Sequence, residues 1–178
     1  MLKLAIPVFL ISAALSGVPN YLSASSSCGD EVVGFESLVA GSDRIVEAKI
    51  LDKRSKLNAD GTIETVYTLS TITPIKGENG NIQEITIPGG EVAGQGQIIP
   101  GMPELNVGDR NILFLTAKSQ EKQWRMPVGL KAGAMKVQSE SNSSQMKVLR
   151  ANIHSDHVHA ESYTGVINEI FAEVERQD

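Results

Sequence analysis

Residues 44–75 read RIVEAKILDKRSKLNADGTIETVYTLSTITPI, and this stretch decides the fold class. From Val46 to Ile50, apolar residues alternate with charged ones, which is the period of a half-buried β-strand. Residues 58–61, Asn-Ala-Asp-Gly, then form a turn signal. The part after this turn is rich in β-branched residues and also has a period of two. The stretch therefore predicts a long antiparallel hairpin.

The chain on either side of this hairpin continues the β pattern. A short helical turn is expected before it, over residues 35–41, and one long connection is expected over residues 89–108. Further strands are predicted over residues 82–87, 110–116, 124–130, 134–138 and 145–151.

The C-terminal end has a helical period instead. Its apolar residues recur at steps of three and four, which defines one face of an amphipathic helix: Tyr163, Val166, Ile167, Ile170, Phe171 and Val174. We expect this terminal helix over residues 162–176, with Ser162 as its cap. About six short strands with one terminal helix predict a mainly β fold. The expected form is a small antiparallel barrel of the OB or netrin type, or a sandwich, built as a single domain from residues 26–178.

The N-terminus has the three regions of a secretory signal peptide. A positive start ending at Lys3 is followed by an apolar run over residues 4–18 and then by small and polar residues. We expect a signal peptide over residues 1–25 and a periplasmic or secreted protein. The alternative is an uncleaved membrane anchor, but the run is shorter than the roughly 18 apolar residues that a spanning helix needs, and Pro7 interrupts it. No later segment is expected to span a membrane.

The chain has one cysteine, Cys28, so an exported domain has no internal disulfide to stabilise it. Lipid anchoring at Cys28 is an alternative, although Ser25 stands where bacterial lipoproteins usually carry leucine. Removal of the signal peptide removes Lys3 and leaves 15 basic and 21 acidic residues, a net charge of −6. This acidic balance predicts that the protein does not bind nucleic acid.

One part of the chain, from Leu38 to Val137, resembles a widespread group of bacterial exported proteins. The matching sequences are SDRIVEAKI at residues 42–50, PIKG at 74–77 and ITIPGGEVAGQGQIIPGMPELNVGDRNILFL at 85–115. The group carries no agreed activity, so the resemblance implies export and a β-domain only.

A more distant similarity is to netrin-like domains, which include the tissue inhibitors of metalloproteinases. It rests on Ser42-Asp43 with Ile45-Val46, and on Lys76-Gly77 at the end of a strand. The similarity implies an OB-type barrel and, as one possible function, inhibition of an exported metalloprotease. The inhibitors depend on an N-terminal cysteine pair and several disulfides, whereas this chain has Cys28 alone.

The three histidines lie close together in the sequence IHSDHVHAE, at His154, His157 and His159. Imidazole with nearby carboxylates suits zinc, copper or nickel, and His157 and His159 would share one side of an extended segment. The HExxH pattern is absent and no cysteine lies nearby. The competing interpretation is a solvated polar segment before the last helix, with no metal bound.

The long connection contains a glycine-rich sequence that does not spell a nucleotide-binding motif, and prolines follow it where a phosphate-binding helix would have to begin. Loops of this length are uncommon unless they are functional. We therefore expect a partner-binding loop at residues Gly89, Gly90, Gly94, Gly96, Pro100 and Pro103.

No nucleophile elbow or catalytic set is present in the sequence. We therefore expect a non-enzymatic exported module, without a cofactor, that binds an exported protein or an envelope partner or has a structural role. A metal-binding function at the histidines and inhibition of a metalloprotease remain the alternatives.

Overall fold

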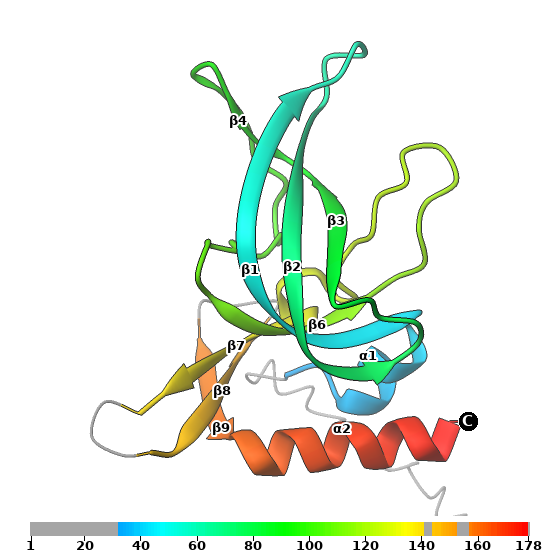
Figure 1. Cartoon of the computed structure of the whole chain (residues 1–178), viewed down its shortest axis with the longest axis vertical. Coiled ribbons are helices and arrows are strands. Elements are labelled where there is room, and N and C mark those ends of the chain that lie inside the picture. Colours follow the sequence, from blue (N-terminus) through cyan, green and yellow to red (C-terminus); the bar gives the residue numbers. More distant parts are fainter. Residues whose placement is uncertain (1–31, 141–143, 153–156, 178) are drawn as a thin grey trace, which may run out of the picture.

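The computed structural model describes residues 32–140, 144–152 and 157–177, so the predicted signal peptide, Cys28 and His154 lie outside the described residues. Its main sheet has seven antiparallel strands in the order β3-β2-β1-β6-β7-β8-β9 (Figure 1). The strands of this sheet are β1 (Arg44–Leu57), β2 (Ile63–Lys76), β3 (Ile82–Pro88), β6 (Arg110–Leu115), β7 (Ala134–Ser139), β8 (Met146–Ala151) and β9 (Val158–Ser162). The other elements are α1 (Phe35–Ala40), β4 (Gly90–Val92), β5 (Gln95–Gln97), the 3-10 helix η1 (Leu130–Gly133) and α2 (Tyr163–Gln177).

The predicted long hairpin is confirmed. β1 and β2 are 14 residues each and pair from Ile45 with Lys76 to Leu57 with Ile63. A register shift lies between Ile50 and Asp52, and such bulges bend the strand that carries them. β1 pairs with β6 only over Arg44 to Lys49, so the far half of the hairpin extends beyond β6, and there β2 pairs with β3 from Glu64 to Ser70 (Figure 1).

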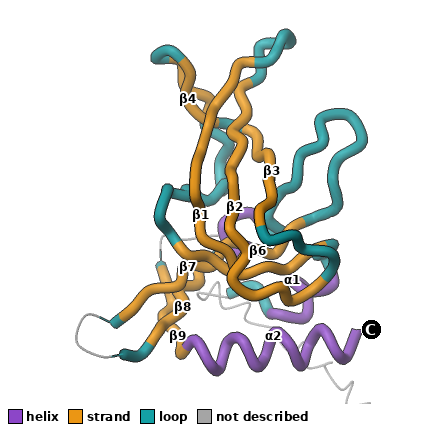
Figure 2. The backbone as a smooth tube through the Cα atoms, viewed as in Figure 1, coloured by secondary structure: helices purple, strands orange, loops and turns teal. Residues whose placement is uncertain are grey.

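The sheet is buried on both faces, and each face has its own apolar core. On one face, α1 and α2 cover β1, β6, β7 and β8, as Figure 2 shows. That core is Phe35, Leu38, Val39, Ile45, Ile75, Ile112, Phe114, Met135, Val137, Val148, Val166, Ile170 and Val174. On the concave face, the sheet encloses a second core of Val46, Ala48, Ile50, Leu69, Ile85, Ile87, Leu105, Leu113 and Leu115.

The mainly β class is confirmed, but the sheet is open. In the described residues β3 and β9 are its two ends and do not pair, so of the expected barrel or sandwich no closed barrel forms in this part of the chain. β7, β8 and β9 continue the sheet away from β6 instead of returning to β3. An irregular segment bonds to both β3 and β6. The Arg125 N–H donates to the Thr86 carbonyl of β3 at 3.1 Å, and the Val128 N–H donates to the Phe114 carbonyl of β6 at 2.8 Å.

Two further expectations need correction. Residues 124–130 form a single bridge, Leu115 with Pro127, instead of the expected strand, and the 3-10 helix η1 follows. β9 forms in the segment 158–162, where the sequence suggested only a polar connection. The terminal helix is confirmed as α2, over Tyr163–Gln177. None of the described helices has the length and apolar content needed to cross a membrane.

Candidate functional site

The long connection after β3 borders a hollow beside the hairpin. Its first part is a small hairpin of β4 and β5, and β4 lies against β1 and β2. Between this connection and the concave face is a groove of about 880 Å³. The groove is lined by Lys53, Ser55, Thr65, Tyr67, Ile87, Pro88, Gly89, Gly90, Glu91, Ala93, Gly96, Gln97, Ile98, Ile99, Met102, Pro103, Glu104 and Leu105.

The connection is anchored to the hairpin by a short chain of hydrogen bonds. The Ser55 and Thr65 hydroxyl oxygens are 2.9 Å apart, and the Thr65 hydroxyl donates to the Gly89 carbonyl at 2.7 Å. Gly90 lies directly above this pair with φ +132, and a Cβ there would lie 2.3 Å from Thr65 Oγ1. Only glycine allows this approach, so the backbone conformation at Gly90 positions one wall of the groove.

A second anchor lies at the base of β5. The Ile63 N–H donates to Gln97 Oε1 at 2.6 Å, and the Gly89 N–H donates to the Ile63 carbonyl at 2.8 Å. The returning strand is thus held to the start of β2 from two sides. These contacts hold the groove wall in place without help from a ligand.

The predicted partner-binding loop is only partly brought together at the groove. Gly89, Gly90, Gly96 and Pro103 line it. The other two predicted residues are not among its lining residues: Gly94 lies in the turn between β4 and β5, and Pro100 lies in the turn that follows β5.

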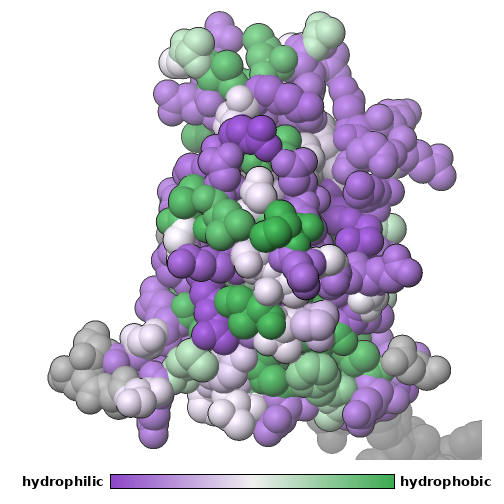
Figure 3. Space-filling view, in the orientation of Figure 1, coloured by the Kyte–Doolittle hydropathy of each residue, from purple (hydrophilic) through white to green (hydrophobic). Residues whose placement is uncertain are grey.

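The groove is lined by apolar and polar side chains in similar measure. Ile98 is 89% exposed and is the most exposed large apolar side chain among the described residues. Glu91 and Glu104 form no ion pair within the described residues, and Lys53 donates to Asn106 Oδ1 at 3.3 Å. Burial, together with the negative charge of Glu104, raises the pKa of the Tyr67 hydroxyl. On the face seen in Figure 3, apolar side chains reach the surface in several separate patches.

The groove-lining residues do not form a nucleophile and base pair. They include neither histidine nor cysteine, and the Ser55 hydroxyl is bonded to another hydroxyl, that of Thr65. Hydroxyl activation needs a base within hydrogen-bond reach.

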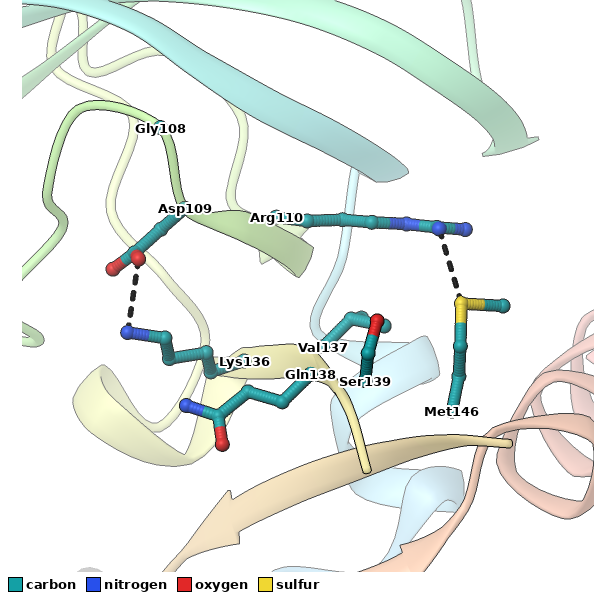
Figure 4. A pocket seen from close by; sticks show the side chains of 8 residues that line it. All are labelled: Gly108, Asp109, Arg110, Lys136, Val137, Gln138, Ser139 and Met146. Carbon is teal, nitrogen blue, oxygen red and sulfur yellow. Dashed lines mark hydrogen bonds and ion pairs between the residues drawn. The ribbon is translucent and has the colours of Figure 1, made fainter. Parts of the chain in front are cut away.

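A second hollow, of about 470 Å³, lies beside the start of β6 and the end of β7. Figure 4 shows Lys136 extending to Asp109, and their charged atoms are 2.9 Å apart. Arg110 extends to the Met146 sulfur, with Nη1 3.2 Å away, while its Nε donates to Glu47 at 2.6 Å. Each cation of this hollow is therefore already paired with a carboxylate of the same chain.

Glu47 is fully buried on the helix-covered face, although the sequence placed it on the polar side of the first strand. Its carboxylate accepts hydrogen bonds from Arg110, from the Thr73 hydroxyl at 2.8 Å and from the Tyr163 hydroxyl at 3.0 Å. Burial and the bond to Glu47 raise the pKa of Tyr163, and the bond to Glu47 raises that of Arg110. The cluster ties the first residue of α2 to β1, which is a structural role.

The histidines are only partly described. His157 precedes β9, His159 lies within it, and His154 is outside the described residues. The Nε2 atom of His159 is buried and has no hydrogen-bond partner within the described residues. Across the described residues, no group of three His, Cys, Asp or Glu side chains could hold a metal ion. The metal site at all three histidines stays a prediction.

Comparison of the chain with known proteins assigns no family. The likeness to exported β-domains and to netrin-like domains therefore stays a prediction from the sequence, and the groove is the candidate site on its geometry alone. No protein-family model, no curated protein and no solved structure matches the chain.

Proposed function

We propose that this chain is an exported, non-enzymatic binding module and that the groove between the hairpin and residues 89–105 takes a segment of a partner protein. The observation that carries the proposal is the exposure of Ile98, 89%, at a hollow that Met102 and Leu105 also line. Covering an apolar side chain that is exposed to this extent removes its surface from water, and this contributes favourably to the free energy of binding. Binding pockets for partner side chains commonly combine such apolar contacts with a few polar groups at the edge.

The charges at the edge favour one kind of partner segment. Glu91 and Glu104 are two carboxylates without an ion pair in the described residues, against one cation, Lys53. A basic side chain of the partner would complete this charge pattern, because complementary charges at an interface edge steer association. The proposed ligand is therefore a peptide segment with an apolar side chain next to a lysine or arginine.

Site-specific photo-crosslinking in the native host tests the groove as the binding surface. A photoreactive amino acid replaces Ile98 in one strain and Ile82 in another. Ile82 is a suitable control because it is also exposed, at 59%, but lies in β3 away from the groove lining. We expect one major crosslinked protein from position 98 and little or none of it from position 82.

The charge pattern is tested on the same crosslinked product. Glu91→Gln combined with Glu104→Gln should reduce the crosslink from position 98 and make it less sensitive to salt, because screening weakens exposed charge pairs. Equal crosslinking from positions 98 and 82, or none from either, would remove the groove as the binding surface.

A further inference from the structure

The two ends of the sheet are not equally available for pairing. At β3, the Arg125 N–H already bonds to the Thr86 carbonyl and Pro88 closes the strand. β9 has the sequence VHAES, without Lys, Arg or Pro, and its register with β8 contains no bulge. Charged residues, prolines, bulges and covering segments are the usual means of preventing edge pairing. Within the described residues β9 has no bulge, proline or covering segment, and Glu161 is its one carboxylate.

The hydrogen-bond pattern identifies which groups of β9 face outward. The Asn152 N–H donates to the His157 carbonyl at 3.1 Å, and Arg150 is opposite His159 in the next bonded position. Because bonded and non-bonded positions alternate in an antiparallel ladder, His157, His159 and Glu161 direct their backbone groups toward β8. The backbone groups of Val158, Ala160 and Ser162 therefore point to the open edge.

The side chains of β9 are complementary to those of β9 in a second copy of the chain related by a two-fold axis. An antiparallel pair of β9 strands centred on Ala160 places His159 of one copy opposite Glu161 of the other, on both sides of the two-fold axis. Directly opposite side chains have Cβ atoms about 4.5–5.5 Å apart, within reach of an imidazole and a carboxylate. An isologous contact of this kind needs such self-complementarity.

Among the residues that the structure describes, α2 leaves room for this contact. α2 begins directly after β9, and its last residue donates from Gln177 Nε2 to the Glu36 carbonyl of α1 at 3.1 Å. The helix therefore runs beneath the sheet toward α1 and away from the β9 edge (Figure 1). The Glu161 carboxylate accepts a hydrogen bond from Arg150 of β8 at 2.9 Å and remains 38% exposed.

We propose that β9 is a homodimerisation edge, in which two copies pair antiparallel about Ala160 and extend the sheet across both chains. The groove lies at the opposite end of the sheet order, so a dimer presents two free grooves. Two linked sites on one assembly strengthen binding to a partner that offers repeated or neighbouring segments.

Sedimentation velocity of the mature chain, recovered from its host over a wide range of concentrations, tests the proposal. We expect a concentration-dependent monomer–dimer equilibrium. Ala160→Pro removes one outward N–H while leaving the bonds to β8 intact, because an edge strand tolerates proline at such a position. It should weaken dimerisation at least about tenfold with an unchanged circular dichroism spectrum.

The side-chain register is tested separately from the backbone. His159→Glu places two carboxylates opposite each other and should weaken the dimer, whereas His159→Glu with Glu161→His restores the complementary pair and should recover it. In a Cys28→Ser background, Ala160→Cys should join two chains through a short thiol reagent, and Val158→Cys, which faces Ser162 of the other copy, should not. A chain that stays monomeric at about 1 mM, or a dimer indifferent to Ala160→Pro, would overturn the proposal.

Discussion

Gly90 shows how a single backbone position shapes the groove. Its φ of +132 and the closeness of Thr65 and Ser55 exclude a side chain there. Gly90→Ala should cost about 2 kcal/mol, because it combines backbone strain with a steric clash. The control is Gly96→Ala, since Gly96 has no positive φ and no atom within 4 Å of an added Cβ. Urea unfolding of both variants measures the difference, and equal losses would contradict this account of the groove wall.

Glu47 is the clearest case of a buried charge in the molecule. Its carboxylate has three hydrogen-bond donors, and removing its charge leaves Arg110 without its counter-ion. Glu47→Gln should therefore lower the free energy of unfolding by about 3 kcal/mol. Glu169→Gln, at an exposed position of α2, should change it very little. A loss below about 1 kcal/mol at Glu47 would show that the cluster is not needed to hold α2 on the sheet.

Glu64 predicts a pH dependence of stability. Burial acts to raise its pKa, but hydrogen bonds from Lys56, Trp124 and Asn58 outweigh this effect and lower the pKa below its usual value of 4.5. A lowered folded-state pKa stabilises the protein above the unfolded value, and this contribution is lost as pH falls through the folded value. The difference in stability between the wild type and Glu64→Gln should therefore shrink between about pH 6 and pH 3.

The control for this pH dependence is Glu78→Gln, because the Glu78 side chain is exposed. Its stability difference from the wild type should stay nearly constant over the same range. A difference at Glu64 that is constant or grows toward low pH would contradict the assigned hydrogen bonds.

At the residue scale, the sequence predicted where the loop would be but not which of its side chains would be exposed. The length and glycine content of residues 89–108 are local features, so a long connection at this position could be predicted. The exposure of Ile98 and the burial of Glu47 depend on contacts with residues far away in the sequence. Arg110 and Tyr163, which surround Glu47, lie more than 60 positions from it.

At the scale of single elements, the apolar stripe of α2 predicted that this helix packs against the sheet. Ile170 is fully buried in the core of the helix-covered face, whereas its neighbour Phe171 is 36% exposed. Ile170→Ala should cost about 2–5 kcal/mol, and Phe171→Ala less than about 1 kcal/mol. Thermal and urea unfolding provide the comparison, and similar losses from the two variants would mean that the helix docks differently.

The elements that could be predicted are those with a strong local period. The hairpin of β1 and β2 and the helix α2 are long and regular, and both are confirmed. β9 has only five residues, three of them polar or titratable, and it forms because β8 offers it a partner. Residues 124–130 show the opposite case, a strand that was predicted and does not form. Their sequence favoured a strand, but β3 and β6 bond to this segment only at isolated positions.

At the scale of the whole molecule, the number of predicted strands and the turn signals between them do not distinguish a closed barrel from an open sheet. Closure depends on which strand returns to β3, and no local pattern encodes that choice. The helices α1 and α2 occupy the outer face of β6, β7 and β8, and the sheet extends under them to β9. The open form leaves the concave face of the hairpin for the groove at one end and a free strand edge at the other.

The groove as a binding surface is the central claim, and a binding measurement tests it most directly. The partner protein is first identified by its crosslink to position 98. Isothermal titration would then measure how tightly this partner binds the wild type, Ile98→Asp and Ile82→Asp. Covering Ile98 stabilises the complex only if the residue enters the interface, and a charge placed in an apolar contact opposes binding. We predict that Ile98→Asp weakens binding at least about tenfold while Ile82→Asp leaves it unchanged. An affinity that Ile98→Asp does not alter would contradict the account.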